Sequence, residues 1–93
     1  MSEIPYDDAE LDICIEWTEP DGLICCEAGY SKREAEKAVA LGDANRWMYS
    51  VYWHLKKGGV EHVADFEPTP EGKRCAEILC DAMETFVKAQ LAA

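Results

Sequence analysis

Strict alternation of apolar and polar side chains in two segments is the feature that most constrains how this 93-residue chain folds. In residues 9 to 17 the large apolar side chains occupy the odd positions from Leu11 to Trp17. In residues 46 to 55 they occupy the odd positions from Trp47 to Leu55. A period of two is typical of a strand with one face packed on a core. The chain is therefore predicted to contain a sheet with one covered face.

Each alternating segment is followed by turn residues and then by a shorter apolar run. The turns at residues 19 to 22 and 56 to 59 contain glycine, which admits positive φ, and the first also contains proline. The returning strands are predicted at residues 23 to 28 and 60 to 66. In the first hairpin we expect Trp17 opposite Ile24, which points Glu27 outward. In the second, the expected inward side chains are Val60, His62, Ala64 and Phe66.

Two helices are predicted from their capping residues. Ser31 and Glu34 form the pattern of a capping box, so a helix should run from Lys32 to Leu41 and end at Gly42. Thr69 and Pro70 are typical of an N-cap and a first helical position. The final helix is predicted to pack on the sheet through an apolar stripe at intervals of three and four residues. That stripe comprises Cys75, Ala76, Leu79, Ala82, Met83, Phe86 and Ala89.

These elements predict an α+β fold class, with a four-stranded antiparallel sheet and two helices on one face in the order ββαββα. Residues 1 to 93 suit a single domain, and the sequence leaves open whether the acidic N-terminal segment, residues 1 to 8, is flexible. Apolar runs are shorter than a membrane span, and the first residues are acidic where a secretory signal is basic. A cytoplasmic location is therefore expected.

Acidic residues are concentrated in the first third of the chain. Residues 1 to 30 contain nine Asp and Glu and no Lys or Arg, whereas the rest contains ten acids and nine bases. The net charge of −10 argues against direct binding of nucleic acid or an anionic membrane, because both require a basic surface. A protein partner with a basic nucleic-acid-binding surface is favoured instead.

The outward side of the first strand is the main candidate for contacting such a partner. Alternate strand residues are about 6.7 Å apart, close to twice the spacing of about 3.4 Å between charges along one DNA strand. A row of carboxylates could therefore imitate a polyanion, although a charged strand face can also serve only solubility. The candidate residues are Asp8, Glu10, Asp12, Glu16, Glu19, Asp21 and Glu27.

The outward side of the third strand is a second candidate contact surface. It carries Met48, Tyr52 and His54, which are more apolar and aromatic than a solvent-facing strand requires. This surface is the basis of an alternative function, in which the chain is a structural or assembly module that joins a homodimer or a larger complex. The acidity would then serve solubility alone.

Neither a cofactor nor a metal site is expected, and we do not expect an enzyme. The chain has five cysteines but no C-x-x-C pair, Cys75 and Cys80 are five residues apart, and the two histidines are isolated from each other. Phosphate-binding glycine loops and nucleophile motifs are also missing. No catalytic residue is therefore predicted.

In size, acidity and the absence of bases from Met1 to Tyr30, the chain resembles phage-encoded small inhibitors of bacterial defence, notably anti-CRISPR proteins. The resemblance implies a cytoplasmic inhibitor in a bacterial host, with a CRISPR surveillance complex or nuclease as its target. The hairpin and helix pattern also resembles small antitoxins, which neutralise a toxin by pairing surfaces. Direct competition with nucleic acid and allosteric inhibition both remain open.

Overall fold

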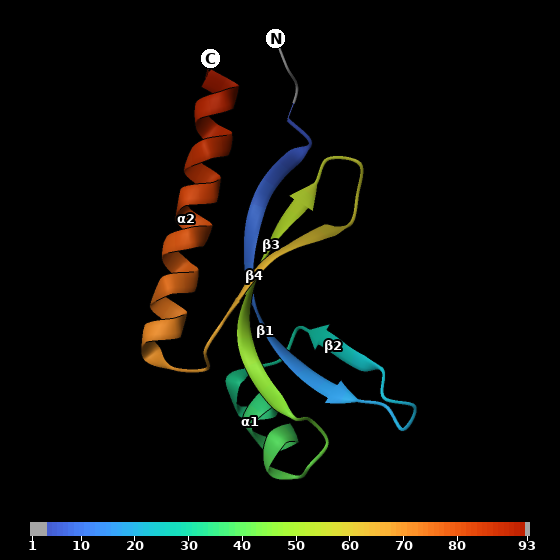
Figure 1. Ribbon diagram of the computed structural model, residues 1–93. Helices are drawn as coiled ribbons and strands as arrows, with labels where there is room; N and C mark the ends of the chain where they lie inside the picture. Colours follow the sequence, from blue (N-terminus) through green and yellow to red (C-terminus); the bar gives the residue numbers. More distant parts are fainter. Residues whose placement is uncertain (1–3, 93) are drawn as a thin grey trace.

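The structure, a computed structural model, describes residues 4 to 92 and contains six elements (Figure 1). They are β1 (Tyr6–Thr18), β2 (Ile24–Ala28), α1 (Lys32–Ala40), β3 (Arg46–Leu55), β4 (Val60–Phe66) and α2 (Pro70–Ala92). The strands form one antiparallel sheet in the order β2-β1-β3-β4. The predicted α+β class, with a four-stranded antiparallel sheet and two helices, is confirmed.

The two alternating strands pair with each other in the middle of the sheet. The β1–β3 ladder runs from Asp8 opposite His54 to Glu16 opposite Arg46, with a register shift before Asp8. Strand β1 begins at Tyr6 rather than at Ala9, so part of the acidic N-terminal segment belongs to the sheet. Residues 1 to 3 of that segment lie outside the described residues.

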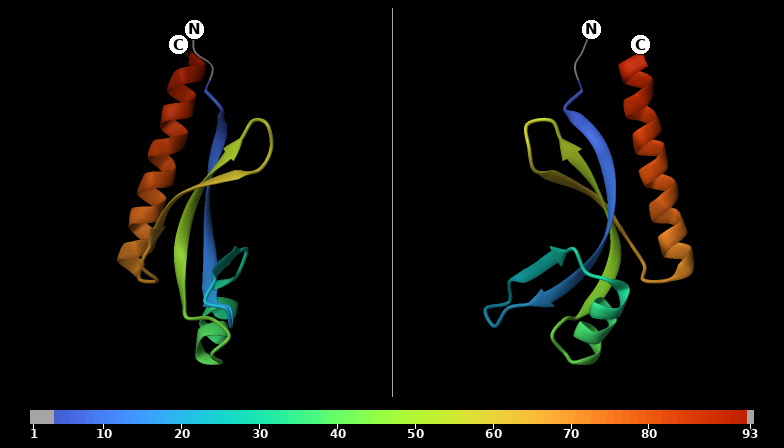
Figure 2. Two further views of the ribbon diagram at one scale, coloured as in Figure 1. Left: turned by 45° about the vertical axis from the view of Figure 1, so that its right-hand side comes forward. Right: turned by 180° about the vertical axis from the view of Figure 1, so that it is seen from behind.

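The core lies on the side of the sheet that carries the odd-numbered side chains of β1 and β3. Ile15, Trp47 and Val51 are buried there together with Ala35 of α1 and Met83 of α2. Both helices therefore cover the same face, α2 along the length of the sheet and α1 beside one end of β1 and β3 (Figure 2).

The helix caps agree with the prediction, but the buried stripe of α2 is rotated. Ser31 and Glu34 form the capping box of α1, and Thr69 accepts a hydrogen bond from the Gly72 amide at the start of α2. Ala76 and Met83 are buried as expected. However, Phe86 is 45% exposed and Val87 is buried instead. Of the predicted stripe, Cys75, Ala82 and Ala89 are exposed as well.

The first hairpin pairs one residue away from the predicted register, which is therefore wrong. Trp17 lies opposite Cys25, and Ile15 lies opposite Glu27. The reason is the connection, because Leu23 belongs to the turn, where its carbonyl accepts a hydrogen bond from the amide of Glu19. The side chain of Glu27 consequently lies on the helix side of the sheet, where it remains exposed at the edge strand.

A bulge in β4 makes the predicted orientation wrong for two of its four side chains, His62 and Val60. Ala64 and Phe66 pair with inward residues of β3, as expected. The register then shifts between Val51 and Tyr52, so that His62 pairs with Tyr52 and faces the other side. Val60 is likewise exposed rather than inward. An extra residue in one strand reverses the faces that follow it.

The fold is elongated and thin for its length. Its radius of gyration is 15.3 Å and its extents are 50 × 30 × 17 Å. A compact chain of this size would have a radius of gyration of about 12 Å. Between residues 4 and 92 no helix lies on the other side of the sheet (Figure 2). Neither helix between residues 4 and 92 has the length and apolar character needed to cross a membrane.

We predict that Gly72→Ala destabilises the fold by about 3 kcal/mol, as overpacking does. A Cβ at this position would lie 1.9 Å from the carbonyl oxygen of Glu67, in backbone that flanks the helix cap. An exposed helical Gly→Ala change normally stabilises by about 1 kcal/mol. Urea denaturation followed by circular dichroism measures the difference, with Lys73→Ala as the exposed control. A gain in stability would refute this contact.

Candidate functional site

The sheet is curved so that its side opposite the helices is concave, because the middle of β1 bows toward α2 and the two hairpins project away from the helices (Figure 2). We call this side the concave face. Its central side chains are deeply covered, with Cys14 at 1%, Met48 at 2% and Ser50 at 1% exposure. By register it also carries Asp8, Glu10, Asp12, Glu16, Cys26, Arg46, Tyr52, His54, His62 and Asp65.

Four of the seven predicted acidic residues share this face. Asp8, Glu10, Asp12 and Glu16 occupy successive outward positions of β1, interrupted only by Cys14. We call these four carboxylates the acidic row. Glu16 forms an ion pair with Arg46, at 3.1 Å between Oε1 and Nη2.

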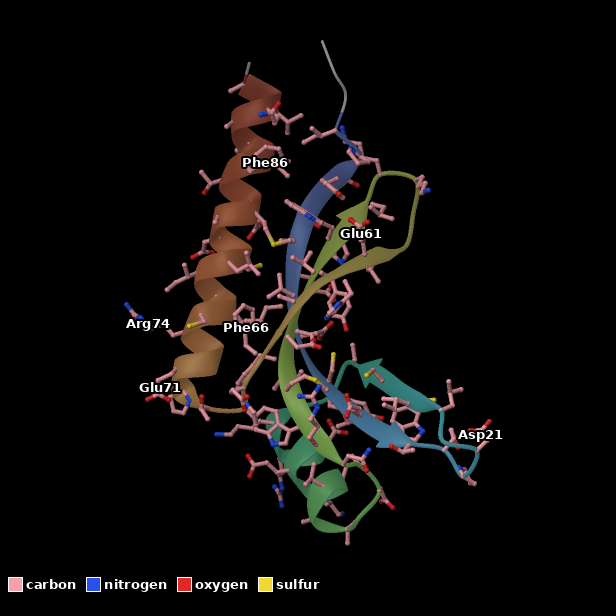
Figure 3. All side chains as sticks on the ribbon, in the orientation of Figure 1. Asp21, Glu61, Phe66, Glu71, Arg74 and Phe86 are labelled. Carbon is pink, nitrogen blue, oxygen red and sulfur yellow. The ribbon has the colours of Figure 1, made fainter. Side chains whose placement is uncertain are left out.

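The other three acids lie elsewhere. Glu19 accepts a hydrogen bond from the indole nitrogen of Trp17, and Glu27 accepts one from the hydroxyl of Tyr30. Asp21 lies at the tip of the β1–β2 hairpin, where it accepts a hydrogen bond from the Leu23 amide (Figure 3). These side chains cap local structure and do not extend the acidic row.

His54 connects two members of the acidic row. Its Nδ1 is 2.5 Å from Asp8 and its Nε2 is 2.9 Å from Glu10. Both ring nitrogens can donate only when the imidazole is protonated. The hydrogen bond to Asp8, followed by that to Glu10, accordingly raises the pKa of His54. This histidine is therefore a pH-dependent counterion of the row.

The carboxyl groups of Asp12 and Glu10 interact, so that Asp12 keeps its proton to a higher pH than a free carboxyl group would. A hydrogen bond with Glu10 is the main cause that raises the pKa of Asp12 to about 6, and burial adds to it. The same hydrogen bond lowers the pKa of Glu10. The acidic row consequently gains charge as the pH rises through 6.

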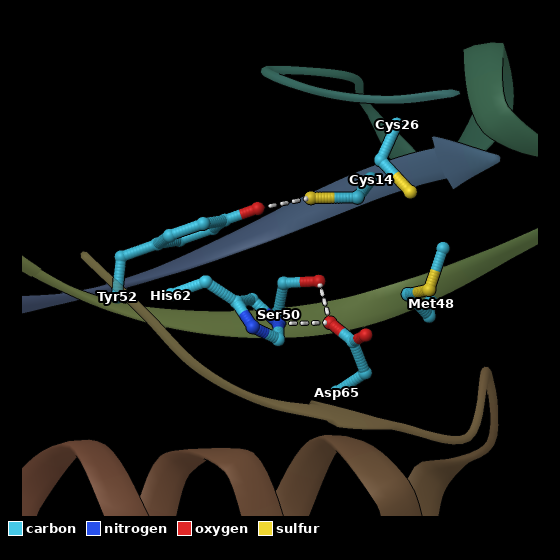
Figure 4. A pocket seen from close by; sticks show the side chains of 7 residues that line it. All are labelled: Cys14, Cys26, Met48, Ser50, Tyr52, His62 and Asp65. Atoms are coloured by element: carbon cyan, nitrogen blue, oxygen red, sulfur yellow. Dashed lines mark hydrogen bonds and ion pairs between the residues drawn. The ribbon is translucent and has the colours of Figure 1, made fainter. Parts of the chain in front are cut away.

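A cavity of about 220 Å³ opens at the centre of the concave face (Figure 4). Ser50 donates a hydrogen bond of 2.6 Å to Asp65, and His62 is 2.8 Å from the same oxygen, Oδ1. The hydroxyl of Tyr52 is 3.1 Å from the sulfur of Cys14. The cavity is lined by Cys14, Cys26, Met48, Ser50, Tyr52, His62 and Asp65.

The polar groups of this cavity do not have the order of hydrogen bonds found around an activated serine. An activated serine requires a base on its hydroxyl, whereas here Asp65 stands between Ser50 and His62. Burial raises the pKa of the Cys26 thiol, which disfavours the reactive thiolate. Among residues 4 to 92 no three His, Cys, Asp or Glu side chains are grouped as metal ligands require.

Two of the three residues of the second predicted surface, Met48 and Tyr52, line this cavity, whereas His54 contacts the acidic row. Tyr52 and His54 are half-buried, and Met48 is buried at 2% exposure. Sequence alternation placed Cys14 and Ser50 on this side of the sheet, but it gave no indication of burial there. His62 was missed because the bulge in β4 turns it onto the concave face. Asp65 was missed although alternation with Ala64 and Phe66 already placed it on this side, opposite Ser50.

We predict that Asp12→Asn stabilises the protein at pH 7.5 and not at pH 4.5. A raised carboxyl pKa means that the folded state prefers the protonated form, so stability declines as the pH rises from about 4 to 6. Asparagine remains neutral and still donates to Glu10. Solvent screening of this half-buried side chain limits the gain to about 1 kcal/mol.

Thermal or urea denaturation at both pH values measures this effect, with Glu77→Gln on α2 as a control that removes the same charge from an exposed position. Equal changes in the two variants at pH 7.5 would contradict the coupling between Asp12 and Glu10.

Comparison of the chain with protein-family models, with curated proteins and with solved structures finds no significant match. The function therefore has to be inferred from the concave face itself. Its most distinctive property is a row of carboxylates beside a small cavity, both on the same side of the sheet.

Proposed function

We propose that the protein is a non-enzymatic inhibitor whose concave face binds a Lys/Arg-rich, nucleic-acid-binding surface of another protein. The observation that carries this proposal is the acidic row, four carboxylates on one side of the sheet, three of them at alternate positions of β1 and the fourth beyond Cys14. For Asp8, Glu10 and Asp12 the spacing of about 6.7 Å between alternate strand residues is shorter than the Debye length of about 8 Å at physiological salt. The charges therefore act on a basic partner together.

The charge balance of the concave face supports a cationic partner. With Asp65 of β4 the face carries five carboxylates, and its one permanent cation is Arg46 at one end of the ladder. His54 offsets part of this charge when it is protonated. As the pH rises above 6, Asp12 ionises and the face becomes a stronger site for Lys and Arg side chains.

The edges of the face support a protein partner in particular. Ile24 is 63% exposed and Val60 is 55% exposed, and both belong to the concave side by register. An apolar side chain on each edge strand offers contacts that nucleic acid or a simple counterion would not use. Carboxylates between them would steer and orient a basic protein.

The resemblance to phage-encoded anti-defence inhibitors suggests which proteins to test first. A CRISPR surveillance complex or nuclease in the bacterial cytoplasm has the required basic groove for nucleic acid. In this proposal the acidic row occupies part of that groove, and the inhibitor acts stoichiometrically. If the inhibitor obstructs the groove, it competes with nucleic acid for the same site. If it acts allosterically, inhibitor and nucleic acid can bind the partner together.

We predict that replacing Asp8, Glu10, Asp12 and Glu16 by Ser weakens binding about tenfold or more, mainly through the association rate, and flattens its salt dependence. The partner is first captured from nuclease-treated bacterial lysate with the tagged protein, and its affinity is then measured at rising salt. The control variant has the same net charge and carries Ser at four exposed positions outside the concave face. These positions are Glu36, Glu67, Glu77 and Asp81.

The proposal requires the control to bind within about twofold of the parent protein. Equal losses in both variants would mean that net charge matters and not the acidic row. Equal affinity in all three proteins would rule out the concave face as the contact surface.

The assembly module is a second candidate, because the exposed Ile24 and Val60 would also suit contact between two copies. Sedimentation of the purified protein distinguishes the candidates. A stable dimer that dissociates on Tyr52→Glu would favour assembly, since Tyr52 borders the cavity on this face. A monomer at micromolar concentration favours the inhibitor.

A further inference from the structure

The cavity on the concave face contains a carboxylate whose position is fixed by its neighbours. Ser50, at 1% exposure, and His62 both contact Oδ1 of Asp65. This leaves Oδ2 without a donor among residues 4 to 92. The side chain of Asp65 is 37% exposed, so an incoming cation can reach it. A carboxylate held in this way binds a cation without first losing side-chain freedom.

The remaining walls suit the apolar part of a long cationic side chain. Met48, Cys14 and Cys26 contribute sulfur and methylene groups, and Tyr52 contributes an aromatic ring with its hydroxyl at the sulfur of Cys14. The cavity volume of about 220 Å³ is large enough to admit several side-chain atoms. The arginine side chain beyond Cα has seven non-hydrogen atoms.

The charges around the cavity favour the same occupant. Asp12, Ser50 and Asp65 lie opposite one another across β1, β3 and β4, so a carboxylate stands on each side of the buried hydroxyl. Adjacent strands are about 4.8 Å apart. Asp65 lines the cavity and Asp12 belongs to the neighbouring strand, so the charge around Ser50 favours a cation over an anion.

We propose that this cavity receives an arginine side chain of the partner protein, with its guanidinium paired to Asp65 and its stem along Met48 and Tyr52. The inference rests on the proposed function and specifies how the partner is recognised. Arginine fits better than lysine because the planar guanidinium is weakly hydrated and stacks on aromatic rings. Lysine carries a strongly hydrated point charge that gains less from apolar walls.

The test uses three short peptides that differ at one position, which is arginine, lysine or the neutral isostere citrulline. The protein is labelled at the methionine methyl groups and at backbone nitrogen. The arginine peptide should shift the methyl signal of Met48 in a saturable way and leave that of Met83, in the core under α2, unchanged. Its affinity should exceed those of the other two peptides by about fivefold or more.

Asp65→Asn should abolish the preference for arginine, whereas Glu67→Gln, an exposed acid beyond the end of β4, should retain it. If arginine and lysine peptides bind equally and shift only the amides of the acidic row, the cavity is not an arginine site although the proposed function stands. If neither peptide shifts the acidic row or Met48, the inference and the proposed function both fail.

Discussion

The antiparallel ladder between β1 and β3 is the interaction on which the rest of the structure depends. Its register, with Ile15 opposite Trp47 and Glu16 opposite Arg46, divides two amphipathic strands into a core side and a charged side. A slip of one residue would exchange the two sides and bury carboxylates under α2. The helices therefore enforce the register by covering the odd-numbered side chains, and the acidic row follows from the same pairing.

A row of like charges on adjacent outward positions is costly to fold, and the face contains three groups that reduce this cost. Arg46 pairs with Glu16 at one end, His54 contacts Asp8 and Glu10 at the other, and Asp12 retains its proton until the pH approaches 6. His54 stabilises the fold below its unfolded pKa and loses this effect as the pH rises through its raised folded pKa. A rise in pH therefore increases the negative charge of the acidic row and at the same time lowers the stability of the fold.

Local patterns in the sequence were sufficient for the strands, the caps and the outward position of Asp8, Glu10, Asp12 and Glu16, because each depends on near neighbours. They were insufficient wherever one residue changes the register. Leu23 in the turn moved Glu27 to the helix side, and the bulge in β4 turned His62 toward the concave face. The cavity arises from curvature of the whole sheet, which buries Met48 and Ser50 on a side that alternation alone marks as exposed.

The central claim is that the concave face occupies a site that would otherwise bind nucleic acid. The most direct measurement forms the complex with its captured partner, adds increasing amounts of the nucleic acid that the partner binds, and follows the dissociation of the labelled protein. The account predicts that nucleic acid displaces the labelled protein. More nucleic acid should be needed when more of the labelled protein is present, because the two compete for one site. A ternary complex that persists at saturating nucleic acid would contradict it.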